Sequence, residues 1–250
     1  MRWTLGIATA LSGLLLTGAL IAAAFPGPHR MLCPGCFGLV EIAPDVFTDA
    51  PPARHAGLLR MIAAADRTTS RFFGGLQSRP WIVMCATKAC MRAFTRGHHA
   101  SGVTFGWHVI RLAPRGLRQH IMTHERMHAE LHRRLGYAGM AQNAIPTWFD
   151  EGLAVLISND RRLISRQSRA ATQWISSVHS PSDWRRAVSA RGWRATYSAA
   201  VTRVVAYERV IGRAGLRRVV ARVVAGQDFE AALHGEVTAA KRARPRRRRP

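Results

Sequence analysis

Six consecutive residues, Thr123-His124-Glu125-Arg126-Met127-His128, form an HExxH motif in a stretch with helical periodicity. Residues four apart lie on one face of an α-helix, about one turn from each other, so two imidazole rings can meet on one metal ion. Glu125 directly follows the first histidine and can reach a water molecule held by that metal as a general base. The spacing predicts a zinc site with His124 and His128 as ligands and Glu125 as the catalytic carboxylate.

A catalytic zinc ion takes three protein ligands and keeps one position open. Downstream of the motif, segment 145–157 is largely apolar but carries two carboxylates, Asp150 and Glu151. A carboxylate in an apolar helix is costly to bury unless it is paired or bound to a metal, so we expect Glu151 to be the third ligand. Asp150 is the alternative; it points about 100° away from Glu151 around the helix.

Four histidines recur every four residues on the helix predicted over 116–135: His120, His124, His128 and His132. Any neighbouring pair has the spacing of metal ligands. Only His124 and His128 have a glutamate directly after the first member. We therefore interpret His120 and His132 as surface residues or as supports of the site rather than as ligands.

The HExxH motif and the stretch Trp148-Phe149-Asp150-Glu151-Gly152-Leu153-Ala154 together resemble the gluzincin metallopeptidases, which include the thermolysin and aminopeptidase N groups. The resemblance implies a zinc-dependent hydrolase of peptide bonds, with a peptide or protein as its substrate. It also implies an oxyanion donor from a helical lobe. Tyr197 is our candidate, because it lies near the start of a predicted helix after the third ligand, and Tyr207 and His179 are the alternatives.

The chain departs from the gluzincin pattern at two points. Val155 stands where the thermolysin group has an aspartate that orients a zinc histidine, so that support must come from elsewhere. The Gly-Ala-Met-Glu-Asn motif that binds a free amine in the aminopeptidase N group is absent. The resemblance therefore predicts a peptidase without indicating aminopeptidase specificity.

Periodicity and turn residues predict an α+β fold. We expect a helix at 53–73, a strand at 81–85, a short helix at 88–94, and strands at 103–105 and 107–112, whereas 43–45 and 51–52 are loop-like. After Asn159 we expect helices at 161–178, 184–191, 197–210 and 216–224, and a short one from 229. This is a zincin-like layout: a small mixed sheet with helices, then an active-site helix and a mainly helical C-terminal lobe. By resemblance, the zinc cleft lies between the lobes, and strand 107–112 forms the sheet edge where a peptide docks.

We predict that the metallopeptidase domain covers residues 26–240 and that the two ends of the chain lie outside it. The run from Trp3 to Phe25 carries no charge and is long enough to span a bilayer. We interpret 1–25 as a membrane anchor, with a cleaved signal peptide as the alternative, so that the catalytic domain is exported and extracytoplasmic. Segment 241–250 is predicted to be a disordered basic tail that makes weak contacts with an anionic lipid or polymer.

The four cysteines fit an oxidising compartment. Local pairing of Cys33 with Cys36 and of Cys85 with Cys90 is the simplest of three connectivities. A redox CxxC motif and a zinc ribbon are the alternatives. The redox motif would need a thioredoxin-like βαβ fold after it. The zinc ribbon would need two residues, rather than four, between Cys85 and Cys90.

The chain is strongly basic, with 37 Lys and Arg against 14 Asp and Glu, a formal net charge of +23. This suggests an anionic partner, although arginines scattered over a solvated surface give the same balance. They are not interleaved with aromatic residues, so we expect no specific nucleic-acid recognition. Two other functions remain open: an exported zinc-binding protein with this fold but no peptidase activity, and a binder of anionic polymers or nucleic acid.

Overall fold

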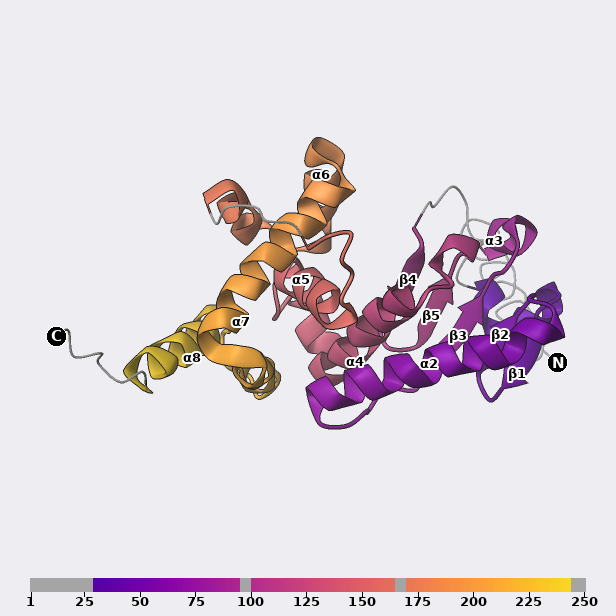
Figure 1. The fold of residues 1–250 in the computed structure, drawn as a ribbon, viewed down its shortest axis with the longest axis horizontal. Coiled ribbons are helices and arrows are strands. Elements are labelled where there is room, and N and C mark those ends of the chain that lie inside the picture. The colour runs from indigo at the N-terminus through magenta and orange to yellow at the C-terminus, as the bar shows by residue number, and fades with distance from the viewer. Residues whose placement is uncertain (1–28, 95–99, 165–169, 244–250) are drawn as a thin grey trace, which may run out of the picture.

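The fold is described from a computed structural model and covers residues 29–94, 100–164 and 170–243. It combines helices with one five-stranded mixed sheet, which confirms the predicted α+β class. The sheet and helix α2 lie at one end of the molecule, α7 and α8 lie at the other, and α4 and α5 lie between them (Figure 1).

The sheet has the order β1-β2-β3-β5-β4. Its strands are β1 (Val40–Ala43), β2 (Val46–Thr48), β3 (Trp81–Met84), β4 (Gly102–Phe105) and β5 (Val109–Leu112). The three central strands are parallel, and both edge strands, β1 and β4, are antiparallel to their neighbours.

Pro44 and Asp45, expected in a loop-like stretch, form the tight turn of the β1–β2 hairpin, with Asp45 in the left-handed region (φ 64°). The two strands of this hairpin were not expected from the sequence. The expectation that strand 107–112 is an edge of the sheet was wrong. Strand β5 lies between β3 and β4, because the hairpin that turns at Gly106 folds β4 back along its outer side.

Helix α2 (Pro52–Phe73) packs against α4 and the sheet and ends at Gly74, whose left-handed backbone (φ 77°) suits a glycine. This confirms the helix expected at 53–73. The short helix α3 (Lys88–Phe94) is also confirmed. The core of this sheet lobe is apolar; its buried side chains include Leu58, Ile62, Ile82, Ile110, Leu112 and Met122. Short 3-10 helices occupy His29–Leu32, Pro34–Phe37 and Pro114–Gly116.

The motif helix, α4 (Gln119–Ala141), begins and ends later than expected. It cannot begin at Gly116, because that residue belongs to the 3-10 turn after Pro114 and lies against the backbone of Ser101. Gly136 interrupts the helix as expected (φ 66°), but helical structure resumes after it. Helix α5 (Thr147–Ser158) then runs beside α4, with Pro146 as its N-cap.

The C-terminal helical lobe consists of η4 (Ala170–Ser177), α6 (Pro181–Arg191), α7 (Trp193–Val224) and α8 (Phe229–Ala243), packed around α5. Helix α7 joins the two helices expected at 197–210 and 216–224 across a break at Gly212. The helix expected at 161–178 is wrong: 161–163 form a turn and 170–177 a 3-10 helix. Residues 241–243, expected in the tail, extend α8.

Both disulfides join the expected pairs, Cys33 with Cys36 and Cys85 with Cys90. A zinc ribbon of free thiolates is therefore excluded. Within residues 29–94, 100–164 and 170–243, no helix is both long and apolar enough to cross a membrane. The predicted anchor at 1–25 and the tail beyond 243 lie outside the described residues.

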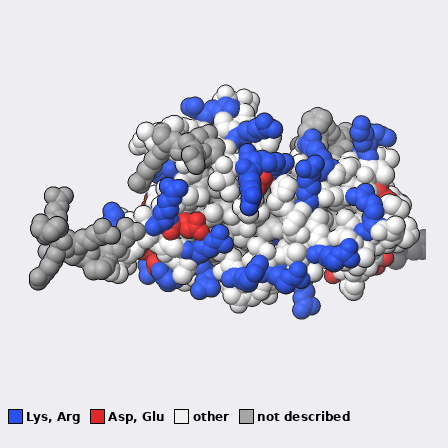
Figure 2. Space-filling model, in the orientation of Figure 1, with Lys and Arg blue, Asp and Glu red and all other residues white. Residues whose placement is uncertain are grey.

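Lys and Arg side chains are spread over the visible face rather than gathered in one patch, with a few carboxylates among them (Figure 2). Several arginines lie against aromatic rings or carboxylates, as Arg134 does against Phe73 and Glu130. On this face, the spread of positive charge therefore does not mark a binding site.

Candidate metal centre

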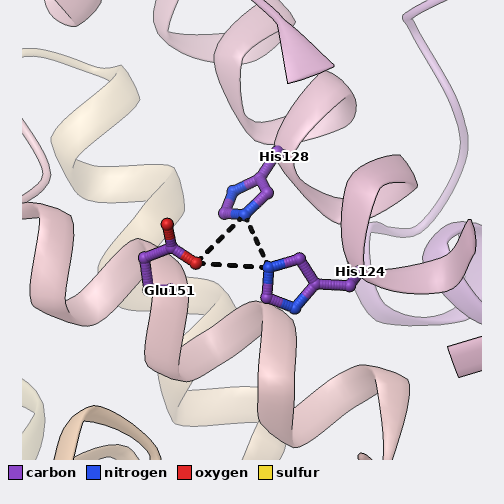
Figure 3. A group of neighbouring side chains, drawn as sticks. All are labelled: His124, His128 and Glu151. Atoms are coloured by element: carbon purple, nitrogen blue, oxygen red, sulfur yellow. Dashed lines mark hydrogen bonds and ion pairs between the residues drawn. The ribbon is translucent and has the colours of Figure 1, made fainter. Parts of the chain in front are cut away.

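The three predicted ligands meet at one point between α4 and α5 (Figure 3). His124 Nε2 lies 3.0 Å from His128 Nε2 and 3.2 Å from Glu151 Oε2. His128 Nε2 lies 3.4 Å from Glu151 Oε2. A tetrahedral zinc ion with bonds of about 2.0–2.1 Å separates its ligand atoms by about 3.3 Å. The spacing and the donor types thus fit a metal ion held by two imidazoles and one carboxylate.

Asp150, the alternative ligand, instead supports His128. Its Oδ1 accepts a hydrogen bond from His128 Nδ1 at 2.8 Å, which leaves Nε2 free to face the ligand cluster. Its Oδ2 lies 3.1 Å from His132 Nε2, and His132 Nδ1 lies 3.1 Å from the carbonyl oxygen of Gly106. Asp150 therefore supplies the orienting carboxylate that the sequence pattern lacked at Val155.

His128, His132 and Asp150 form a second group of side chains whose ligand atoms lie close enough together to hold a metal ion. We interpret this group as the support of the first, because His128 contacts Asp150 through Nδ1 and directs its other nitrogen, Nε2, to the first group. His132 thus extends the support from α5 to the β4–β5 turn. His120 joins neither group: its Nε2 is buried without a partner among the described residues, and burial lowers its pKa.

The cluster is built to hold positive charge. Burial lowers the pKa of His128, but the carboxylates of Asp150 and Glu151 more than offset this and hold it well above the usual value. Burial raises the pKa of Glu151, yet His128 and His124 reduce it to about 2. Asp150 likewise has a pKa well below the usual range because of its histidine partners, despite burial.

Glu125 lies beside the ligands, on the side of the edge strand. The carboxylate is buried, and Oε2 accepts a hydrogen bond from the Thr104 hydroxyl at 2.7 Å. A Cβ atom on Gly102 would lie 2.5 Å from Oε1, so only glycine leaves room for this carboxylate. Arg111, buried on β5, is close enough for Glu125 to raise its pKa against the lowering by burial.

Tyr197, on α7, is the only predicted oxyanion donor that lies at this site within the described residues. Its ring centroid is 6.0 Å from that of His124 and 4.9 Å from that of Trp184. Burial, and then the negative charges of Glu151 and Glu125, raise the pKa of Tyr197 well above its usual value, so the hydroxyl stays protonated. The alternatives lie elsewhere: Tyr207 packs on Trp148, and the carbonyl of His179 accepts from Thr147.

A cavity of about 770 Å³ opens beside the cluster. His124, Glu125 and Tyr197 contribute to its wall. Gly102 lines it from the sheet lobe, and Trp184 lines it from the helical lobe. The cavity therefore lies between the lobes, where a cleft was expected.

A buried polar network fixes the opposite face of α4, and the sequence pattern did not reveal it. Glu130 is fully buried and accepts hydrogen bonds from the backbone amides of Gln77 and Ser78, the Ser78 hydroxyl and Arg134. Arg126, the first variable residue of the motif, donates to Asp66 and to Ser78. This network holds α4 in the rotation that turns His124 and His128 toward α5. The signal in the sequence is the spacing of Arg126, Glu130 and Arg134.

Comparisons with protein-family models, with curated proteins and with solved structures found no match.

Proposed function

We propose that the protein is a zinc-dependent metallopeptidase that hydrolyses peptide bonds. The observation that carries the proposal is the convergence of His124 Nε2, His128 Nε2 and Glu151 Oε2 at 3.0–3.4 Å, with the carboxylate of Glu125 on the same cavity. A metal held for structure alone is usually enclosed by four protein ligands. Here three ligands beside a cavity favour a catalytic role.

A zinc ion bound at these residues would supply a Lewis acid that polarises a peptide carbonyl and lowers the pKa of water. The protein groups do the rest of the chemistry. Glu125 accepts the proton of the attacking water and later transfers it to the leaving amine. Thr104 and Gly102 hold its carboxylate in place, because one donates a hydrogen bond and the other leaves the space.

Tyr197 is the proposed donor to the oxygen that becomes negative as the carbonyl is attacked. Its raised pKa keeps the hydrogen on the hydroxyl throughout the neutral range. A donor already held beside the site stabilises developing charge without reorganisation. We infer that the Tyr197 hydroxyl donates a hydrogen bond to this oxygen of the substrate.

The edge strand β4 is the proposed docking strand for an extended peptide. It pairs with β5 on one side, and among the described residues no strand pairs with its other side. Ser101 and Gly102, where the strand begins, line the cavity. A peptide that adds to this edge would run past the metal centre. The role expected for segment 107–112 therefore passes to the neighbouring strand.

The proposed setting is outside the cytoplasm. The two disulfides support an oxidising compartment. Segment 1–25 would tether the domain to a membrane, and the basic tail would add weak contacts with anionic lipid or polymer.

The proposal is tested by metal analysis and peptide cleavage with the purified full chain. We expect about one zinc ion per chain and cleavage within a random peptide library, detected by mass spectrometry. A chelator should abolish cleavage, and added zinc should restore it. Stoichiometric zinc without cleavage of any peptide would instead support the non-peptidolytic alternative, and a lack of metal would reject both.

A further inference from the structure

The cavity beside the metal centre has an unbalanced charge. Three arginines line it: Arg115 from the sheet lobe, Arg162 after α5, and Arg185 on α6. The cavity wall contains two carboxylates within the described part of the chain: Asp160, which pairs with Arg162, and Glu125, which accepts a hydrogen bond from the neutral Thr104 hydroxyl. Neither Arg115 nor Arg185 has an ion-pair partner among the described residues. With three arginines against two carboxylates, the net charge of the described cavity wall is positive.

One of the three arginines is fixed in position. Asp160 is buried, and its two oxygens accept from Arg162 Nε at 2.8 Å and from Arg162 Nη2 at 2.6 Å. This bidentate pair holds the plane of the guanidinium group. The Arg162 side chain is 44% exposed, and within the described ranges Asp160 is its one ion-pair partner. The pair thus presents a rigid hydrogen-bond donor at the cavity wall rather than a mobile surface charge.

The rest of the wall is apolar. Trp184 and Leu163 are buried there, and the half-exposed ring of Trp193 forms part of the rim. An apolar wall lowers the local dielectric constant and strengthens the attraction between a ligand carboxylate and nearby guanidinium groups. A ligand that fits this cavity would combine an anionic group with an apolar one.

We propose that this cavity recognises a carboxylate of a peptide substrate, so that the enzyme selects acidic peptides. Arg162 donates hydrogen bonds to the carboxylate, Arg115 and Arg185 attract it from the two sides of the cavity, and an apolar side chain of the same peptide packs on Trp184. The carboxylate belongs to a Glu or Asp side chain or to the C-terminus of the peptide. This inference rests on the proposed function for its peptide ligand, but binding can be measured without turnover.

The test measures peptide binding to the full-length Glu125→Gln protein with zinc, at about 0.15 M salt, where distant charges are screened. The probes are fluorescein-labelled octapeptides of Ala and Leu with an amidated C-terminus. One series carries a single Glu at successive positions, and the matched series carries Gln. A third series carries Gln and a free C-terminal carboxylate. Fluorescence anisotropy gives the ratio of affinities for each matched pair, and the third series separates the two sources of the carboxylate.

We expect one position, or the free C-terminus, to favour the carboxylate about tenfold, since hydrogen bonds to charged groups are worth about that much. Arg115→Gln together with Arg185→Gln should reduce this ratio at least about threefold, the scale of exposed ion pairs. Arg162→Lys should reduce it as well although the charge is kept, because lysine lacks the planar donor group. Arg67→Gln, an exposed change on α2 outside the cavity wall, removes one charge and should leave the ratio unchanged.

Equal affinity for Glu and Gln peptides at every position, with no gain from a free C-terminus, would overturn the proposal. A fall in the ratio for Arg67→Gln as large as for the cavity variants would overturn it too, because the preference would then reflect only the net charge of +23. Cleavage without a preference for acidic peptides would reject this inference alone. A binding preference without any cleavage by the wild-type protein would reject the proposed function and leave this inference standing.

Discussion

Replacing Asp150 tests whether this carboxylate supports His128 or is itself a ligand. The carboxylate is largely buried between two histidines, at 2.8 Å from His128 Nδ1 and 3.1 Å from His132 Nε2. In Asp150→Asn the amide oxygen can still accept from His128, but the negative charge is lost. A charge-assisted hydrogen bond is about twice as strong as a neutral one, so the loss is on the order of 1 kcal/mol.

We therefore expect Asp150→Asn to weaken zinc binding about fivefold. Asp150→Ala, which removes both hydrogen bonds, should weaken it about 100-fold, the upper range for residues that orient a metal ligand. Zinc affinity would be measured by competition with a chromophoric chelator at pH 7.5, and circular dichroism would check that each variant is folded. His128→Ala provides the comparison, because loss of a ligand should remove stoichiometric zinc.

Asp160→Asn is the matched control. It neutralises another buried aspartate near the cavity, but its partner is Arg162 rather than a zinc ligand, so zinc affinity should not change. The reasoning would be refuted if Asp150→Asn bound zinc as tightly as the wild type. It would also be refuted if folded Asp150→Asn bound no zinc, as His128→Ala should, because Asp150 would then act as a ligand.

Three further predictions concern Glu125, Tyr197 and the metal-free cluster. In Gly102→Ala the new Cβ would clash with the carboxylate of Glu125, so kcat should fall at least about tenfold at constant zinc content. An unchanged kcat would show that Glu125 does not act from this position. Tyr197→Phe should lower kcat about 10²-fold with little change in KM or zinc content, the cost of losing one oxyanion donor; a change in KM alone would assign Tyr197 to substrate binding. In the metal-free protein, the raised pKa of His128 stabilises the fold fully when the pH is below the unfolded-state pKa of about 6.5. This contribution is lost as the pH rises through the folded-state pKa. The lowered pKa of Glu151 acts in the opposite sense. It stabilises the fold above about pH 4.3, and this contribution is lost as the pH falls toward the folded-state pKa of about 2. Thermal melting should therefore show a lower Tm at pH 8.5 than at pH 5.5 for the metal-free protein and a smaller or reversed difference with zinc; a metal-free Tm that rises over this range would contradict the assignment.

The positions of the metal ligands could be predicted from the sequence because they depend on local geometry. A helix places His124 and His128 one turn apart whatever surrounds it. The cost of burying Glu151 in an apolar helix is also visible in the sequence. The structure brings these three residues together as expected, and it places Tyr197 beside them.

Other features depend on contacts between distant segments, and no local pattern shows them. The role of Asp150 depends on how α5 is rotated against α4, which the Arg126–Glu130 network and the packing of Gly152 on Ala200 together determine. The place of β4 at the edge depends on which strand pairs with β3. Strands β1 and β2 are short, and the prolines around them resemble loop residues.

The most direct test of the central claim is a paired measurement on Glu125→Gln. Zinc content per chain is determined by elemental analysis, and cleavage is followed with the peptides that the wild-type protein cleaves. Because Glu125 lies outside the ligand set and acts only on the proton of water, we predict unchanged zinc content and a loss of activity of at least about 10²-fold. Wild-type activity in a zinc-loaded Glu125→Gln protein would contradict the account.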